Sequence, residues 1–332
     1  MPITATAAAD VAEDWLAAGS ARALVGQLDG PLREAVATGD AELEEMALQL
    51  VGRPGKRVRP ALVALAADLG DPDPHRLTRA AVGIELLHIA SLYHDDIMDR
   101  AGLRRGAATA SSRWGPALAA VAGTFVAARG LRQFAPDDTL VRLVSRTLTE
   151  LATGQLREVQ NAFALDLPPR EHIEIVAQKT GSLFRLPCQV GAVVGGVGPE
   201  ARDALARYGA HLGIAFQLAD DALDLEGDPA EIGKPIAGDL REGSYGLAVL
   251  LAAQATGSLP VALRRLLRKA SKDATDLRAL VAMLHESGAV AEAGKAAEIH
   301  RDSAVAAARE LPAGPVRDSL IELAAYATER TR

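Results

Sequence analysis

Two groups of aspartates occur in this sequence with the same internal spacing. Residues 95–99 are Asp-Asp-Ile-Met-Asp, and residues 220–224 are Asp-Asp-Ala-Leu-Asp. On a helix, residues four positions apart lie on one face, so the first and last aspartates of each group can converge on one cation. Mg²⁺ prefers oxygen ligands and often bridges to substrate phosphates. Two facing groups could therefore hold several divalent ions around a diphosphate and neutralise the charge that develops on a leaving oxygen.

The surroundings of the aspartates decide between a functional and a solvated interpretation. A single Asp-Asp-x-x-Asp on a helix is most often a solvated face, because charged residues are mostly exposed. Here the flanking residues are apolar, among them Ile89 and Leu92. A buried row of like charges is unfavourable unless a metal or counter-charges are present. A second copy of the pattern in another apolar segment is much rarer by chance, and this favours a functional site.

Several short basic segments offer groups that could bind the anion. Arg binds diphosphates through its planar fork and Lys through a point charge. Each segment alone is more often plain surface charge, and gains meaning only beside the aspartates. The segments are Gly-Lys-Arg-Val-Arg-Pro at 55–60, Arg104-Arg105-Gly106, Lys179-Thr180-Gly181 and Lys234-Pro235.

Helices are the elements that must position these groups. The chain has 332 residues, of which 49% are hydrophobic and only 3% aromatic, and it is rich in strong helix formers. Gly and Pro separate helix-length segments, and Asp73, Pro136-Asp137-Asp138 and the Pro-rich residues 312–315 mark helix starts. The pattern predicts about ten or more helices in one all-α domain over residues 1–332. The two aspartate groups are predicted within helical segments at 80–100 and 213–224.

Composition and charge argue against several other classes of protein. The net charge of −7 argues against a nucleic-acid partner. The single cysteine, Cys188, cannot form an internal disulfide and is predicted to be a small core residue. The N-terminus lacks the pattern of a secretory signal, and no apolar stretch reaches the length of a membrane span. These features predict a soluble cytoplasmic protein.

Taken together, the motifs resemble those of the trans-isoprenyl diphosphate synthase, or polyprenyl synthetase, family. The resemblance covers roughly residues 50–250, and the motifs follow the family order. It implies an isoprenoid-synthase-type helical bundle around a deep central cavity, usually assembled as a homodimer. The matching segments are residues 55–60, 86–99, 104–106, 179–184, 216–224, 233–235 and 238–243.

The resemblance also implies roles for individual residues. Mg²⁺ is the implied cofactor, with about three ions per site, and its implied ligands are Asp95, Asp99 and Asp220. The implied catalytic residues are Asp95, Asp96, Asp99, Asp220, Asp221, Asp224 and Lys179. Those implied for isopentenyl diphosphate are Lys56, Arg57, Arg59, His88 and Arg105. Those implied for the allylic diphosphate are Arg104, Lys179, Thr180, Gln217 and Lys234.

The implied reaction joins these two diphosphate substrates. The allylic C–O bond breaks as the charge on the leaving diphosphate is stabilised. The double bond of isopentenyl diphosphate, held nearby, attacks the allylic cation, and a proton is then lost. The product is a linear all-trans polyprenyl diphosphate.

Two residues depart from the common family pattern. Many members have Asp after the glycine that corresponds to Gly123, whereas this chain has Thr124. Many also have Lys where this chain has Ser244, and that Lys would touch the diphosphate. The second change puts affinity for the allylic substrate in doubt, although Lys179 and Lys234 remain.

Small residues before the first aspartate group predict a long product. Ala90 and Ser91 lie about one turn before Asp95, where short-chain members of the family tend to carry aromatic residues. A small pair leaves the product tunnel open, which predicts a product longer than C15, between C20 and C50. The residues proposed for a deeper floor are Leu86, Leu87, Phe125 and Phe134.

Two alternative functions remain open from the sequence. A class I terpene cyclase on the same scaffold would share the first aspartate group but usually carries a different second metal site. A non-catalytic subunit of a heteromeric synthase would usually lack the aspartates, although Thr124 and Ser244 keep this alternative open. Consumption of isopentenyl diphosphate distinguishes the synthase from the cyclase, and the absence of any turnover by the purified chain alone would favour the non-catalytic subunit.

Overall fold

The fold is all-α apart from one short hairpin in the described parts of the chain. The structure is a computed structural model that describes residue 16 and residues 19–53, 55–104, 107–226, 238–257, 259–269 and 273–329. None of the helices within these ranges is long and apolar enough to cross a membrane. The predicted all-α class is confirmed.

The chain divides into two compact units. The first comprises Met1–Val144, Leu186–Leu205 and Ala308–Leu323, and the second comprises Ser145–Arg185, Ala206–Ala307 and Ala324–Arg332. Some helices contribute residues to both units, namely α8 (Asp138–Gln160), α10 (Ser182–Val194), α11 (Pro199–Glu226), α17 (Ala289–Arg309) and α18 (Pro315–Glu329). The single domain and the central cavity stay predictions.

The first unit contains the helices that precede α8. These are α1 (Ala21–Gln27), α2 (Asp29–Val36), α3 (Ala41–Val51), α4 (Val58–Ala67), α5 (Pro74–Met98), α6 (Ala110–Trp114) and α7 (Pro116–Arg132). The hairpin lies between α5 and α6 and pairs β1 (Leu103–Arg104) with β2 (Ala107–Ala108) in antiparallel register. Cys188 is buried in this unit, as predicted.

Helix α5 carries the first aspartate group at its C-terminal end. The Asp73 side chain accepts a hydrogen bond from the Arg76 backbone N–H at 2.8 Å, and Pro74 occupies the first turn. Both are favourable at a helix start, and the predicted cap is confirmed. The helix ends at Met98, with Asp99 as its C-terminal cap. The sequence segment 80–100 therefore predicted the helix but not its first turns.

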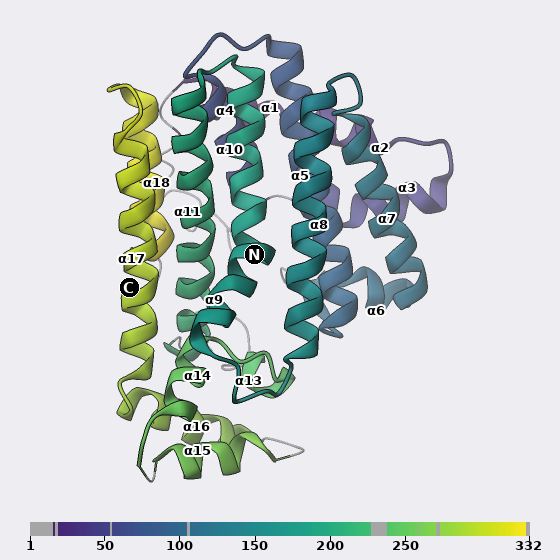
Figure 1. Ribbon diagram of the computed structural model, residues 1–332. Coiled ribbons are helices and arrows are strands. Elements are labelled where there is room, and N and C mark those ends of the chain that lie inside the picture. The colour runs from purple at the N-terminus through teal and green to yellow at the C-terminus, as the bar shows by residue number, and fades with distance from the viewer. Residues whose placement is uncertain are drawn as a thin grey trace, which may run out of the picture. The chain divides into compact units, whose positions relative to one another are not determined.

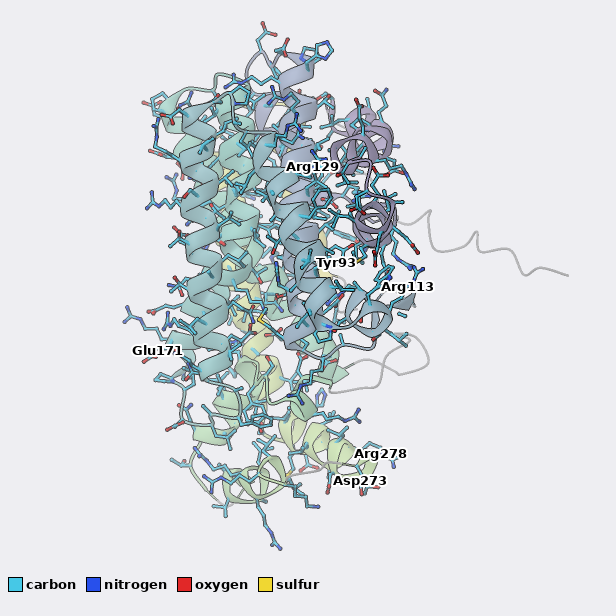
Figure 2. The ribbon with its side chains drawn as sticks, turned by 90° about the vertical axis from the view of Figure 1, so that its right-hand side faces the viewer. Tyr93, Arg113, Arg129, Glu171, Asp273 and Arg278 are labelled. Atoms are coloured by element: carbon cyan, nitrogen blue, oxygen red, sulfur yellow. The ribbon has the colours of Figure 1, made fainter. Side chains whose placement is uncertain are left out.

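Glycines and one tyrosine fix the neighbours of α5. Helices α5 and α7 lie side by side (Figure 1). A Cβ atom added at Gly123 of α7 would lie 2.9 Å from His94 Nε2, so the absence of a side chain permits this close approach. The fully buried Tyr93 (Figure 2) donates from its hydroxyl to the Met46 carbonyl at 2.6 Å, which ties α3 to α5.

The second unit contains the remaining helices around their own apolar core. They are α9 (Pro169–Val176), the π-helical turn η2 (Ala177–Gly181), α13 (Gly238–Glu242), α14 (Leu247–Gln254), α15 (Leu259–Leu267) and α16 (Ala274–Glu286). Leu218, Leu250 and Leu280 are among the core residues.

The basic segment Lys179-Thr180-Gly181 lies in η2. No proline separates α9 from α10, and the chain passes from one to the other through one wide turn. A Cβ atom added at Gly213 of α11 would lie 2.8 Å from the Gly181 Cα atom. The two glycines thus bring η2 close to α11. Such π-helical turns occur frequently at functional sites.

Candidate active site

The first aspartate group presents its carboxylates in different environments. Asp95 is half-buried and Asp99 is exposed, whereas Asp96 is buried. The Asp96 Oδ1 atom accepts a hydrogen bond from Arg104 Nε on β1, while Oδ2 is buried and has no hydrogen-bond partner among the described residues. Burial raises the Asp96 pKa, and the Arg104 ion pair opposes this shift. Asp95 and Asp99 are therefore the accessible pair of this group.

Arg57 is held inside the first unit by protein groups. Its backbone is left-handed, with a φ of 47°, and its side chain is buried. The guanidinium donates to Glu85 Oε1 at 2.6 Å and to Asp29 Oδ1 at 3.4 Å. It also donates to the backbone carbonyls of Val51 and Arg53. These contacts favour a role in fixing the loop before α4 over direct contact with a substrate.

Arg59 and His88 form a second polar pair in the same unit. Arg59 Nη1 lies 3.1 Å from His88 Nε2. Burial lowers the Arg59 pKa to about 10, and the nearby carboxylates of Glu85 and Asp95 counteract this shift. The first unit thus brings two residues predicted for isopentenyl diphosphate close to the first aspartate group. Lys56 is exposed at the same loop.

The second aspartate group belongs to a hydrogen-bonded network in the second unit. Thr180 Oγ1 donates to Gln217 Oε1 at 2.9 Å, and Gln217 Nε2 donates to Asp221 Oδ1 at 2.8 Å. Lys179 Nζ donates to Glu158 Oε2 at 2.5 Å. The predicted residues Lys179, Thr180, Gln217 and Asp221 are therefore near neighbours, because η2 packs closely on α11.

Burial and neighbouring charges shift two titratable groups of this network. Burial raises the pKa of Asp221 to about 7, and the carboxylates of Asp220, Glu158 and Asp224 add to the shift, although an amide hydrogen bond opposes it. Burial lowers the pKa of His172 to about 4, although Glu158 opposes this shift. His172 Nε2 lies 3.9 Å from Asp221 Oδ2. At neutral pH without a cation, Asp221 is therefore close to the midpoint of its titration.

A small, partly open hollow lies beside the second aspartate group. Its polar lining consists of Asp221, Asp224, Asp239 and Ser244, and its other walls are largely apolar. The Asp239 backbone N–H points to Asp224 Oδ2, with an N···O distance of 3.5 Å. Ser244, the departure noted in the sequence, is thus beside the predicted metal motif. Arg105 and Lys234 lie outside the described residues.

The donor atoms suit Mg²⁺, although no protein cage encloses an ion. Within the described ranges, no group of three or more His, Cys, Asp or Glu side chains is arranged to hold a metal ion. Mg²⁺ does not need such a cage, because it keeps several waters and binds through one or two carboxylates together with substrate phosphates. The orphaned Asp96 Oδ2 and the raised pKa of Asp221 show carboxylates that a cation would stabilise. The residues present therefore fit Mg²⁺.

Three residues of these sites were not found from the sequence. They are Glu158, His172 and Asp239. Glu158 and His172 approach Lys179 and Asp221 only through the fold, and no spacing pattern connects them. Asp239 belongs to the family-like segment 238–243, which was noticed without a role for this residue. Its position in that segment is the feature of the sequence that could have identified Asp239 as a site residue.

The opposite pKa shifts of His172 and Asp221 predict a measurable pH dependence. The ordinary pKa values are 6.5 for His and 3.8 for Asp. Between about pH 4 and 6.5 the folded pair holds one proton, on Asp221, and the unfolded pair also holds one, on His172, so their contributions to the pH dependence of stability cancel. In Asp221→Asn only His172 keeps a shifted pKa, so in this pH range the unfolded state binds one more proton than the folded state. Its free energy of unfolding should therefore rise with pH relative to wild type, by up to about 1.4 kcal/mol per pH unit.

His172→Gln should give the opposite slope. It leaves the raised pKa of Asp221, so stability should fall relative to wild type as pH rises from about 4 towards 7. Urea unfolding at fixed pH values in the presence of a chelator measures both variants. If the free energy of unfolding varied with pH in the same way in wild type and both variants, the opposite pKa shifts of His172 and Asp221 would be contradicted.

Comparisons with known proteins place these sites in context. A family model described as polyprenyl synthetase matches residues 40–284. The nonaprenyl diphosphate synthase of Mycobacterium tuberculosis is 33% identical over 336 residues, which cover 99% of this chain and 98% of that protein. The heptaprenyl diphosphate synthase component 2 of Bacillus subtilis is 30% identical, covering 87% and 82%. A polyprenyl synthase from Caulobacter crescentus CB15, crystallised with calcium and isoprenyl diphosphate, has a TM-score of 0.90 at 31% identity, covering 96% and 98%.

Proposed function

Because the chain belongs to the polyprenyl synthetase family and is a trans-prenyltransferase, we propose that it elongates an allylic diphosphate with isopentenyl diphosphate to a product beyond C15, in the cytoplasm and with Mg²⁺. The observation that carries the proposal is that both aspartate groups are complete and have suitable polar neighbours. Asp95 is close to Arg59 and His88 in one unit. Asp221 is close to Gln217 and Glu158 in the other.

Carboxylates from both groups would hold the cofactor. Asp95 and Asp99 of α5 and Asp220 of α11 are the proposed Mg²⁺ ligands, with about three ions per site. When bound, Mg²⁺ supplies neutralisation of the charge on the diphosphate that leaves the allylic carbon. Calcium in the Caulobacter crescentus structure supports divalent-metal use in the family.

Basic side chains of this chain would bind and orient the substrates. Arg104 and Lys179 are held by carboxylates, Arg104 by Asp96 and Lys179 by Glu158, and these pairings keep both cations oriented. We assign them to stabilising the leaving diphosphate. Lys56, Arg59 and His88, joined by Arg105, would hold isopentenyl diphosphate with its double bond towards the allylic carbon. Thr180, Gln217 and Lys234 are assigned to the allylic diphosphate.

The proposed reaction breaks one C–O bond, forms one C–C bond and releases one proton. The allylic C–O bond breaks and its electron pair leaves with the diphosphate. The π electrons of isopentenyl diphosphate form the new C–C bond, and the proton that is released passes to the departing diphosphate. No covalent nucleophile takes part. The chain therefore contributes charge stabilisation, orientation and exclusion of water.

A transfer assay of the purified chain tests the proposed function. Labelled isopentenyl diphosphate and Mg²⁺ are combined with the C5, C10, C15 or C20 allylic diphosphate, and products are sized after dephosphorylation. A ladder of linear prenyl alcohols supports the proposal. A cyclic hydrocarbon would favour the cyclase. No incorporation by the chain alone, restored by a second protein, would place it beside heteromeric synthase components such as the Bacillus subtilis relative.

Enlarging a small residue before the first aspartate group should shorten the product. Ala90 is buried and Ser91 is half-buried, with Ser91 Oγ donating to the His88 carbonyl at 2.8 Å. We expect Ser91→Phe and Ala90→Phe to reduce the longest product by at least about one isoprene unit, because the ring fills space near the growing chain. The same assay with Ala306→Phe, at an exposed position on α17, is the control. An unchanged ladder in both variants would contradict the assignment.

An exposed apolar row on α7 supports assembly as a homodimer. Leu118 and Val121 are 40% and 53% exposed, and they share a helix face with the half-buried Phe125. We expect the wild-type chain to elute at about twice its mass of 34.6 kDa, and Val121→Glu to shift it towards the monomer. Light scattering after size exclusion measures both, with the exposed Val261→Glu as the control. A monomeric wild-type chain would exclude this assembly.

A further inference from the structure

Phe163 has an unusual conformation and position for a large apolar residue. It follows α8 with a φ of 64°, in the left-handed region that bulky side chains rarely adopt. Its side chain is also 58% exposed. The exposed ring contributes little stability through burial, and the left-handed backbone of a bulky residue is strained. Such a conformation persists only where specific contacts hold it.

The contacts that hold Phe163 come from Gly243. The Phe163 backbone N–H donates to the Gly243 carbonyl at 2.9 Å. A Cβ atom added at Gly243 would lie only 2.5 Å from the Phe163 ring, so the ring lies directly against the glycine. Gly243 itself has a φ of 81°, which glycine adopts without strain. The Tyr245 ring meets Phe163 edge to face, with centroids 6.3 Å apart.

Gly243 connects this ring to the second aspartate group. The backbone N–H groups of Gly243 and Ser244 both donate to the Asp239 carbonyl, at 2.9 and 3.1 Å. The Asp239 N–H in turn points to Asp224 Oδ2 at 3.5 Å. A Cβ atom added at Gly246 would lie 3.2 Å from Asp221 Oδ2, so the end of the same segment lies against a second aspartate.

We propose that Phe163 is a positioning residue that fixes residues 239–246 against Asp221 and Asp224. The ring covers Gly243, the Gly243 and Ser244 amides fix the turn at Asp239, and that turn forms one wall of the hollow beside the aspartates. The strained backbone at Phe163 is thus held by contacts that order the wall beside the second aspartate group. The effect of Phe163 on catalysis rests on the proposed function. Its effect on the order of residues 239–246 can be measured without turnover.

Two variants of Phe163 separate positioning from simple stability. Phe163→Ala removes the ring. Phe163→Gly removes the ring and also relieves the left-handed strain, so global stability should not fall below that of Phe163→Ala. Phe163→Tyr keeps the ring, and its added hydroxyl can reach solvent. Leu156→Ala is the matched control, because Leu156 is a 57% exposed apolar residue of α8.

Hydrogen exchange and Mg²⁺ titration test the proposal on the full chain. In the metal-free chain we expect the amides of residues 239–246 to exchange about 10-fold faster in Phe163→Ala and Phe163→Gly, and unchanged in Phe163→Tyr and Leu156→Ala. The Mg²⁺ concentration that gives a half-maximal thermal shift with inorganic pyrophosphate should rise about 10-fold in the same two variants. Unchanged exchange, or equal effects in Leu156→Ala, would overturn the proposal. If the amides of residues 239–246 exchanged faster in these variants but neither wild type nor any variant transferred a prenyl group, the result would count against the proposed function alone.

Discussion

Asp95→Asn is expected to lower the rate of isopentenyl transfer by about 10³-fold or more while leaving the helical fold intact. The amide has the shape of the carboxylate but no negative charge, so a proposed ligand of Mg²⁺ is lost. Asp95 is half-buried near the end of α5, so its replacement creates no cavity. Steady-state rates at several Mg²⁺ concentrations measure the effect, and circular dichroism reports on the fold.

A distant exposed aspartate provides the control for this variant. Asp302 on α17 is exposed and pairs with the neighbouring Arg301, so Asp302→Asn should keep the wild-type rate. Asp96→Asn should behave differently from both. It removes the charge that holds Arg104, so the orientation of that guanidinium should suffer together with the rate. A wild-type rate in Asp95→Asn would remove this residue from the metal site.

The sequence predicted those parts of the fold that depend on local signals. Helix periodicity and the cap at Asp73 placed α5, and the paired aspartates 95–99 and 220–224 marked two helices correctly. The apolar setting of Cys188 predicted its burial. These signals act over one or two helical turns, so a single sequence contains them in full.

The sequence could not predict contacts that depend on packing between distant segments. Glu158 of α8 meets Lys179 of η2 where a Cβ atom added at Gly154 would lie 2.8 Å from the Lys179 backbone nitrogen. His172 of α9 meets Asp221 of α11 through the packing of these two helices. The hairpin that aims Arg104 at Asp96 consists of two-residue strands, too short for a periodic signal. The π-helical turn likewise results from packing rather than from propensity. The order of the motifs along the sequence is enough to indicate the function, whereas the geometry of the site requires the fold.

Arg57 shows the same limit for the role of a single residue. Its basic neighbours Lys56 and Arg59 suggested a substrate contact, whereas the structure surrounds its guanidinium with protein acceptors. The buried partner Glu85 lies 28 positions away, on another helix, and no local pattern connects the two. If Arg57 positions the loop before α4, removing its buried partner should lower the free energy of unfolding.

Glu85→Gln should destabilise the chain by about 3–5 kcal/mol, because it removes the buried counter-charge of Arg57 and leaves it with the more distant, exposed carboxylate of Asp29. The two side chains are only 6% and 4% exposed, and their charged atoms lie 2.6 Å apart. Urea unfolding followed by circular dichroism measures the loss. The Michaelis constant for isopentenyl diphosphate should rise as well, since Arg57 holds the loop that carries Lys56 and leads into Arg59 in the first turn of α4.

Two further variants separate the buried pair from charge in general. Glu292→Gln removes an exposed partner of Lys295, and it should change stability by less than about 1 kcal/mol. Arg57→Met combined with Glu85→Leu removes both charges and should recover much of the stability lost in Glu85→Gln, because apolar side chains of similar volume can replace a buried pair. Recovered stability without recovered affinity for isopentenyl diphosphate would confirm that Arg57 positions the substrate loop. A loss below about 1 kcal/mol in Glu85→Gln would show instead that water reaches the pair and that the loop is held by other contacts.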